Sequence, residues 1–378
     1  NCINLINIDL SSFNTEKVTN MEKMFYNCHK ISFTFLNFNT EKVTNMNSMF
    51  YNCEKLHSIN LYSFDTSQVT SMSSLFYDCK GLTSLDINHF NTSRVRKMDN
   101  MFNGCSKIEI LNLTLFDTKE VTNMSYMFYN CKLLSELLIY NFITSEVKDM
   151  TRMFYGCSNL PYLDLTFFDT SKVTSMLSMF YNCKNLTSLN VQNFNTSRVK
   201  NMRYMFGNCK KIKQLNLTLF DVSNVTETSF MFYNCFLLSS LNLSNFNMNK
   251  VSKMESMFSG CLMLSSLVLS SIETSSLTTT TKMFYNCASL SELDLSNIIT
   301  KSVKTMDMMF YGCISLTSLN LSHFITTSVD NITQMFYGCS SLQYLNIDNF
   351  NTKNIVDMSY LFYGCSSLTY LNLSSFNT

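Results

Sequence analysis

Cysteine recurs along this chain at a nearly constant interval. The 15 Cys of the 378 residues stand at 2, 28, 53, 79, 105, 131, 157, 183, 209, 235, 261, 287, 313, 339 and 365. Every step is 26 residues except the step of 25 between Cys28 and Cys53. Such a period indicates a repeat array whose units pack against their neighbours. We number positions within a repeat from its Cys, as +1, +2 and so on.

Each repeat contains two apolar patterns. In the repeat that begins at Cys105, apolar residues occupy +3, +6, +8 and +11, and then +16, +19, +22 and +23. The alternation at +6 and +8 predicts a short strand with these side chains on its buried face. The Asn/Asp-Thr pair at +12/+13 suits a cap, and the i, i+3, i+6, i+7 spacing after it predicts a short helix, in part 3₁₀.

These elements predict an α/β repeat solenoid of the leucine-rich-repeat kind. One strand and one helix cannot bury their apolar faces alone, so neighbouring repeats must supply the core. We expect a parallel, concave sheet of about 15 strands with short helices on the convex side. Residues 1–378 would form a single solenoid of about 14.5 repeats without visible caps. It is interpreted as a segment of a longer chain or as a unit that polymerises through open ends.

Departures from the repeat predict local irregularities. The repeat after Cys28 is one residue short within Ile31–Phe38, which alters its strand or the turn that follows. Thr replaces the +19 Met at Thr228 and Thr280, and Ile replaces the +11 Phe at Ile272 and Ile298. We expect these exchanges to loosen the later repeats slightly.

The sequence of the repeat is similar to that of a known family. Residues 313–324 read CISLTSLNLSHF, which contains L-x-x-L-x-L, and residues 335–339 read MFYGC. Together they resemble the BspA-like leucine-rich repeats, and the resemblance covers nearly the whole chain. It implies a surface protein, of bacteria or single-celled eukaryotes, that attaches to a host, a matrix or neighbouring cells.

Composition narrows the possible function classes. The 28 Lys and Arg against 27 Asp and Glu leave a net charge of +1, which argues against nucleic acid as a partner. No stretch has the roughly 18 consecutive apolar residues of a membrane-spanning helix. The four His lie in different repeats, and no phosphate-binding loop, HExxH or nucleophile motif interrupts the period. We expect no enzymatic activity, no cofactor and no metal site.

The cysteine column itself has three interpretations. The thiols are small buried hydrophobes, disulfide partners between adjacent repeats, or metal ligands. Pairing would strain a regular stack and leave one Cys over, and neither CxxC pairs nor nearby His support a metal. We favour free buried thiols.

Position +7 is Asn or Asp in nearly every repeat and should point outward from the strand. Stacked amides there can hydrogen-bond along the sheet. Hydroxyl residues at +9 and occasional Tyr at +5, such as Tyr162, join them. The face is either a polar groove for a glycan or an extended peptide, or a ladder that keeps the sheet soluble, and we favour the ladder. Its candidate residues are Asn112, Asp164, Asn190, Asn216, Asn242, Asp294, Asn320 and Asn346.

A tyrosine row precedes the cysteines by two positions in most repeats. Because the residue before each Tyr belongs to the apolar stripe, we expect the Tyr to be partly exposed with its hydroxyl in water. The row is either a lateral association surface or a cover for the turn and the Cys. Its candidate residues are Tyr129, Tyr155, Tyr181, Tyr233, Tyr285, Tyr311, Tyr337 and Tyr363.

Asn-x-Ser/Thr sequons are frequent, in line with a composition rich in Asn, Ser and Thr. They permit N-glycosylation in a secreted eukaryotic protein but do not argue for it, and a glycan at +7 would block the sheet face. The sequons begin at Asn91, Asn112, Asn123, Asn185, Asn195, Asn216, Asn224, Asn242, Asn320, Asn331 and Asn372.

Two function hypotheses follow for an extracellular or cell-surface location. The first is a non-enzymatic structural protein that forms or decorates a filament, sheath or appendage by self-association, end to end or laterally. The alternative is an adhesin whose concave sheet binds a host or matrix protein or a glycan. A dedicated site should show a cluster of unusual outward residues, whereas a building material should be monotonous. The monotony of the repeats favours the structural protein.

Overall fold

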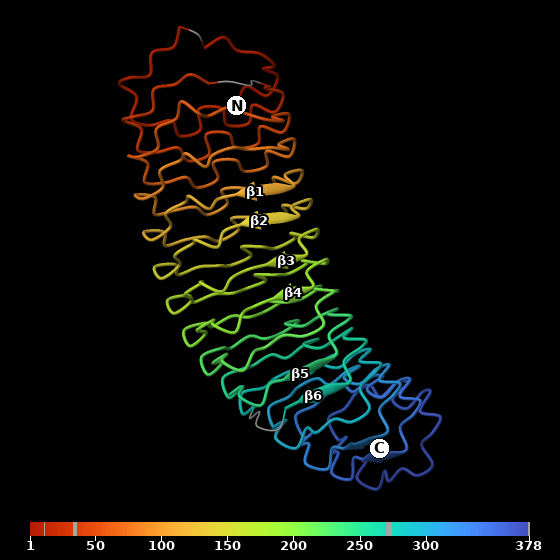
Figure 1. Ribbon diagram of the computed structural model, residues 1–378. Helices are drawn as coiled ribbons and strands as arrows, with labels where there is room; N and C mark the ends of the chain where they lie inside the picture. The colour runs from red at the N-terminus through yellow and green to blue at the C-terminus, as the bar shows by residue number, and fades with distance from the viewer. Residues whose placement is uncertain (11, 33–35, 270–273, 377–378) are drawn as a thin grey trace. The chain divides into compact units, whose positions relative to one another are not determined.

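The computed structural model describes residues 1–10, 12–32, 36–269 and 274–376 (Figure 1). Its contacts divide the chain into two compact units, Asn1–Asn193 (unit 1) and Phe194–Thr378 (unit 2). Within each unit every repeat forms one turn of a coil (Figure 1). The single solenoid over 1–378 stays a prediction. The irregular strand at 33–35 and the Ile at 272 fall outside the described residues.

Short parallel strand pairs mark one side of each coil. The described residues form eight strands in four two-stranded sheets. Unit 1 contains β1 (Ile110–Asn112), β2 (Glu136–Leu138), β3 (Tyr162–Leu163) and β4 (Ser188–Leu189), and unit 2 contains β5 (Ser240–Asn242), β6 (Ser266–Val268), β7 (Ser318–Asn320) and β8 (Tyr344–Asn346). The pairs are β1–β2, β3–β4, β5–β6 and β7–β8, and Leu111 lies opposite Leu137, one repeat later.

The prediction of about 15 strands is wrong for the described part of the chain. Turns bound each strand closely: the amide of Leu134 at +3 donates to the carbonyl of Cys131, and the amide of Phe142 at +11 donates to that of Ile139 at +8. These turns limit each strand to two or three residues, and the same turns also occur in repeats without a strand, such as the one that begins at Cys79. The location of the strands at +5 to +7, with the +6 side chain directed inward, agrees with the sequence pattern.

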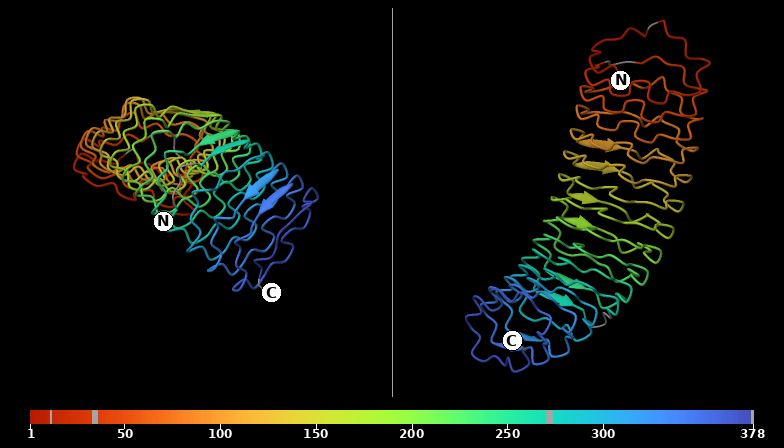
Figure 2. Two further views of the ribbon diagram at one scale, coloured as in Figure 1. Left: turned by 90° about the horizontal axis from the view of Figure 1, so that it is seen from below. Right: turned by 180° about the vertical axis from the view of Figure 1, so that it is seen from behind.

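The predicted helices are also wrong: the described residues contain no helix. Residues 17 to 25 after each Cys form successive turns on the other side of the coil (Figure 2). Two residues per repeat in this segment have left-handed φ, as at Tyr126 (φ 58°) and Asn130 (φ 56°), which an α-helix does not allow. Helices also pack 8–10 Å apart, whereas the stacked Phe102 and Phe128 rings of adjacent repeats are only 5.7 Å apart.

The turns are joined by hydrogen bonds between repeats. The amides of Tyr126 and Phe128 donate to the carbonyls of Thr151 and Met153 in the next repeat, both over 2.9 Å. Successive repeats are therefore linked on both sides of the coil. We call the side at +5 to +9 the strand face and the side at +17 to +25 the turn face. The concave sheet was expected because helices are wider than strands. Since the described residues contain no helix, that reason no longer applies.

The core consists of columns of identical residue types. Most of the predicted apolar positions are buried, and Val121, Met124 and Phe128 have no exposed surface, whereas Phe13 in the first repeat and Leu373 in the last are exposed. A buried Thr at +13 stabilises most turns: the Oγ1 of Thr118 donates to the carbonyl of Ile143 and accepts the amide of the same residue, each over 2.8 Å. The stack thus buries its apolar columns and satisfies the polar group among them.

The cysteines are free and all but the first and last are buried. The Sγ of Cys131 donates to the carbonyl of Phe102 over 3.2 Å, and the same contact recurs in both units. Burial raises the pKa of the Cys131 thiol to about 12. The column therefore packs as small hydrophobes with a weak donor, as the preferred interpretation held.

Candidate functional site

The +7 side chains bond within their own repeat. The Oδ1 of Asn112 accepts the amide and the hydroxyl of Thr114, and Asn242 accepts the amide of Ser244 in the same way. These are Asx turns. The expected amide ladder along the sheet is thus replaced by local capping. The same turn is formed by Asp164, Asn190, Asn216, Asp294, Asn320 and Asn346.

Asx turns occur at two further positions of the repeat. At +12, Asp117 accepts the amide of Lys119, and at +18, Asn123 accepts the amide of Ser125. The +12 cap predicted from the sequence exists, but it begins a turn instead of a helix. The +18 turn was not predicted, although its Asn, Asp or Ser recurs in the sequence. The abundance of Asn thus has a structural cause at three positions of each repeat.

The tyrosine row lies on the turn face and its rings stack on one another. Ring centroids are 4.5 Å apart for Tyr129 and Tyr155 and 5.0 Å for Tyr155 and Tyr181. In unit 2 the rings of Tyr285, Tyr311, Tyr337 and Tyr363 stack at 4.6–4.8 Å, and Tyr233 stands apart from them next to Phe230. Partial burial beside two neighbouring tyrosines raises the pKa of Tyr155. The rings are half-buried, as expected, except for the exposed Tyr363.

The sequons are distributed over all sides of the repeat. Asn91, Asn195, Asn216, Asn224, Asn242 and Asn320 are exposed, whereas Asn112, Asn123, Asn185, Asn331 and Asn372 are half-buried. The Nδ2 of Asn224 donates to the carbonyl of Ser197 over 2.8 Å, so a glycan there must displace a hydrogen bond. Glycosylation stays a prediction.

Unusual outward residues gather on the strand face of unit 1. Positions +5 and +9 are mostly hydroxyl residues, but in unit 1 they include Tyr62, Ile110, Tyr140 and Tyr162. All four are exposed, and Tyr62 is 81% exposed. Ile110, Tyr140 and Tyr162 belong to three consecutive repeats, and Tyr62 lies two repeats before Ile110. This is the kind of cluster that distinguishes a binding site from a uniform surface.

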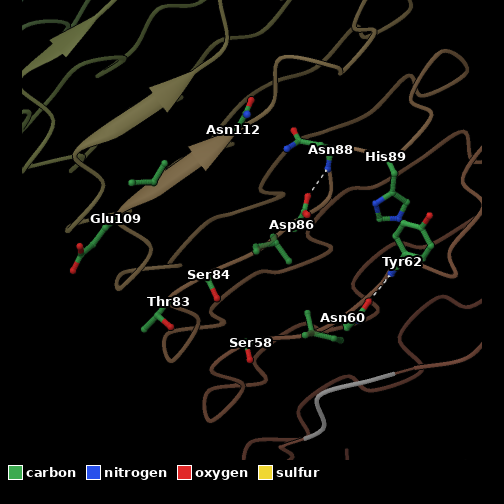
Figure 3. A pocket seen from close by; sticks show the side chains of 13 residues that line it. Ser58, Asn60, Tyr62, Thr83, Ser84, Asp86, Asn88, His89, Glu109 and Asn112 are labelled. Atoms are coloured by element: carbon green, nitrogen blue, oxygen red, sulfur yellow. Dashed lines mark hydrogen bonds between the residues drawn. The ribbon is translucent and has the colours of Figure 1, made fainter.

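A shallow hollow of about 790 Å³ forms one end of this cluster (Figure 3). It is lined by residues of three consecutive repeats: Ser58–Tyr62, Thr83–His89 and Glu109–Asn112 contribute. The Tyr62 and His89 rings lie beside each other, 5.7 Å between centroids, and the Nε2 of His89 donates to the carbonyl of Leu61. Backbone and Asx turns thus hold the aromatic rim in place (Figure 3).

The strand face of unit 1 is acidic. In residues 57–65, 83–91, 109–117, 135–143 and 161–169 there is no Lys or Arg. The carboxylates there are Asp65, Asp86, Glu109, Asp117, Glu136, Asp164 and Asp169. Hydrogen bonds from the hydroxyl and the amide of Thr166 lower the pKa of Asp164, so this carboxyl stays ionised. Of these carboxylates, Asp86, Glu136 and Asp164 lie at +5 to +9 and the others flank the strand face. Positions +5 to +9 of unit 2 also contain no Lys or Arg, so the near-zero net charge of the chain conceals strand faces of one sign.

The strand face of unit 2 is more uniform. Hydroxyl residues occupy most of its outward positions, and the exposed aromatics are Tyr344 and Tyr370 near its end. The described residues contain no group of three His, Cys, Asp or Glu arranged to hold a metal. The same part of the chain contains no apolar helix long enough to cross a membrane.

The cluster on unit 1 was missed because each member is a single departure from the repeat. The sequence reveals Tyr162 at +5 as unusual, but Tyr62 and Tyr140 at +9 stand in other repeats. Only the register of the stack brings these positions together. A comparison of columns across adjacent repeats would have found them, together with the lack of Lys and Arg.

Comparison with family models gives a match along the whole chain. The family described as "Mycoplasma protein of unknown function, DUF285" matches residues 1–110, 59–161, 100–214, 148–268 and 266–376. No curated protein matches the chain. The overlapping matches and the 26-residue register of the strands confirm the recognition of leucine-rich repeats of the BspA-like kind.

Several solved structures resemble the chain. It is 18% identical to a leucine-rich repeat protein from Bacteroides ovatus ATCC 8483 over 94% of this chain and 86% of that one, with a TM-score of 0.46. It is 18% identical to a leucine rich cell surface protein from Faecalibacterium prausnitzii A2-165, over 93% and 82%, with a TM-score of 0.46. For a leucine-rich repeat protein from Eubacterium ventriosum ATCC 27560 the values are 17%, 98%, 90% and 0.44.

Proposed function

Because this chain belongs to the family described as DUF285 and folds as leucine-rich repeats, we propose that it is a non-enzymatic interaction protein of the cell surface. Its binding site is the strand face of unit 1. The observation that carries the proposal is the cluster of exposed Tyr and Ile side chains on a face without Lys or Arg. With this cluster the outward residues are no longer uniform. Their uniformity was the main reason to regard the chain as a building material only.

The chemistry of this face suits an extended, positively charged segment of a partner protein. Carboxylates such as Glu109 and Glu136 can pair with Lys or Arg, and tyrosine faces attract the same cations. These groups stand at differing positions of several repeats along the stack, so an extended partner can meet one contact after another. A compact partner would reach only a few of the carboxylates.

The surface location rests on the resemblance to the BspA-like repeats. It is tested by labelling intact cells with an antibody against the chain, before and after mild protease treatment. Labelling of intact cells that the protease removes supports the proposal. Labelling only after permeabilisation contradicts it.

The binding proposal is tested with peptides of defined charge. Fluorescence anisotropy compares an eight-residue peptide of alternating Lys and Phe with its Glu and Phe counterpart and with a neutral oligosaccharide. We expect the Lys peptide to bind, with an affinity that falls as salt rises. The double variant Tyr62→Ala, Tyr162→Ala should weaken binding about tenfold, whereas the control Tyr370→Ala in unit 2 should not. Preference for the oligosaccharide or the Glu peptide contradicts a cationic partner.

Self-association into a filament, sheath or appendage is a second candidate function. It is favoured by the half-buried tyrosine row and by exposed apolar side chains at the edges of the strand face. Electron microscopy of the protein across a concentration series tests it. Ordered filaments or sheets that lengthen with concentration support the proposal, and isolated particles at every concentration contradict it.

A further inference from the structure

Exposed apolar side chains gather at both edges of the strand face. In unit 1 a patch follows the strand, at positions +9 to +12, and in unit 2 a patch precedes the strand, at +1 and +2. Single exposed apolar residues also stand at the other edge of each unit, Leu133 in unit 1 and Leu219, Ile299 and Ile325 in unit 2. We define the exit patch as Leu115, Tyr140, Ile143 and Phe167, and the entry patch as Leu237, Leu262, Met263 and Ile314.

The residues of the exit patch differ from those at the same repeat positions in most other repeats. Position +10 is often Asn or His, and Asn141 there donates to the carbonyl of Thr114 in the repeat before. Leu115 and Phe167 replace this polar link with exposed apolar surface, 72% exposed for Phe167. Ile143 occupies +12, where most repeats have an Asx turn. Four apolar residues in three consecutive repeats are therefore unexplained by the fold.

The exit patch surrounds a hollow. Its volume is about 350 Å³, and Tyr140, Ile143, Phe167 and Asp169 are among the residues that line it. Apolar side chains form its walls, and Asp169 adds a negative charge. A hollow of this kind suits an apolar side chain that approaches beside a cation.

The entry patch offers such side chains. Position +1 or +2 is Lys in most repeats of unit 1, but in unit 2 three repeats carry the patch instead. Met263 is 52% exposed and Ile314 is also exposed, although nothing in the turn requires an apolar residue there. The Nζ of Lys210 lies 4.7 Å from the ring centre of Phe236, next to the patch. A long flexible Met suits insertion into a shallow hollow.

The charges around the two patches are opposite. Positions +9 to +12 in residues 62–169 include Asp65, Asp117 and Asp169 and no Lys or Arg, although the Nζ of Lys119 lies 3.2 Å from the carboxylate of Asp117. Positions +1 to +4 in residues 210–317 include Lys210, Lys211 and Lys213 and no Asp or Glu. Like patches of two copies would repel each other, whereas exit and entry patches attract.

We propose that copies of this chain associate side by side, with the entry patch of one copy packed on the exit patch of the next. Both patches are built on stacks with the same 26-residue register, so consecutive side chains of one copy meet consecutive side chains of the other. The contact joins two different surfaces, and it leaves the exit patch of the first copy and the entry patch of the second copy free. Such heterologous contacts lead to rings or open arrays and not to closed pairs.

This inference rests on the second candidate function, self-association. The exit patch shares Tyr140 with the cluster on the strand face, so the variants below leave that residue unchanged. It names the two surfaces and predicts that every contact joins one surface of each kind. The tyrosine row would make a contact between identical surfaces instead, so the two modes differ in what a mixture of variants does.

The experiment uses two variants of the full chain, Phe167→Asp in the exit patch and Met263→Asp in the entry patch. Analytical ultracentrifugation follows each alone and the two mixed. Each variant alone should stay monomeric at concentrations where the natural chain assembles. In a 1:1 mixture, the intact entry patch of Phe167→Asp meets the intact exit patch of Met263→Asp, so pairs should form and growth should stop there. Leu115→Asp should reproduce the effect of Phe167→Asp.

Val356→Asp is the matched control, because Val356 is an exposed apolar residue of unit 2 outside both patches. It should assemble like the natural chain. If the natural chain and Phe167→Asp assemble equally, the two patches do not form the contact. Self-association itself is then still supported. If both variants are monomeric and their mixture forms no pairs, the heterologous contact is wrong. A natural chain that stays monomeric overturns both proposals.

Discussion

A methyl group added to Gly156 would lie 2.3 Å from the Oδ1 of Asn130 in the preceding repeat. Both residues stand directly before a Cys and have left-handed φ, 73° and 56°. The Asn side chain thus occupies the space that the Gly leaves open. The same arrangement joins Asn234 with Gly260. Where Asn follows Asn, the later amide donates to the earlier one instead, as Asn52 does to Asn27 over 3.1 Å.

Gly156→Ala should destabilise unit 1 more than Gly338→Ala destabilises unit 2. Both sites have nearly the same φ, so both substitutions incur a left-handed penalty of about 1–2 kcal/mol. Only at 156 must the Asn130 side chain also move, because the nearest atom at 338 is 3.8 Å away. We expect an additional loss of about 1 kcal/mol at 156. Urea unfolding measures both, and Asn130→Gly should remove the additional loss. Equal losses at the two sites would contradict the contact.

Thr280→Met should stabilise unit 2. Thr280 stands where most repeats have a buried Met, has no exposed surface, and its Oγ1 has no hydrogen-bond partner among the described residues. A buried unpaired hydroxyl costs about 1–3 kcal/mol, and Met restores the apolar column. Thr228→Met is the comparison, since the Oγ1 of Thr228 donates to the carbonyl of Lys253. Hydrogen exchange of the adjacent amides should slow more in Thr280→Met. A gain confined to Thr228→Met would refute the argument.

The stack explains why part of the fold was predictable. The buried columns and the strand around +6 could be predicted from the spacing alone, because the same pattern of apolar residues recurs from repeat to repeat. The turn face did not follow, since the spacing of Val121, Met124 and Met127 fits both a helix and turns that close every three residues. Its left-handed residues are Tyr126 in one repeat and Arg152 in the next, and neither type signals that conformation.

The site was less predictable than the fold. The outward direction of +7 was right, but the Oδ1 of Asn112 accepts the amide of Thr114 in its own repeat, and the residue opposite Asn112 in the next repeat is Leu138. The exposed Tyr62 and Ile110 stand in different repeats and at different positions, and only the structure shows that they line one hollow.

Leu217→Ala should cost about 2–5 kcal/mol, because Leu217 is buried at +8 with 1% of its surface exposed. Leu219→Ala, two residues later and 66% exposed, should cost little. Chemical unfolding followed by circular dichroism compares the two variants. Similar stabilities would mean that the +8 column is not the core.

Alkaline pH should unfold both units through their thiols. Burial raises the pKa of Cys131 and Cys235 to about 12, against an ordinary value of 9.0. The folded state binds more protons than the unfolded state between these values, so the stability is complete below about pH 9 and falls as pH rises towards 12. Partial burial raises the pKa of Tyr51 to about 12 and acts in the same direction above pH 10.

A pH titration measures thiolate absorbance and circular dichroism together. Thiolate should form only as the secondary structure is lost. If thiolate forms near pH 9 while the fold persists, the cysteines are accessible and the buried column is wrong.

The hydrogen bonds between repeats have a mechanical consequence. On both faces of unit 1 they connect each turn of the coil only to the next, as from Phe128 to Met153. A force that pulls the coil apart along its stack therefore acts on the contacts between repeats in series, and the weakest set of bonds gives way before the next. Each released repeat of 26 residues adds about 90 Å of extended chain before the next one yields. A surface layer built from such coils would stretch in steps under flow and absorb the tension before any covalent link is strained.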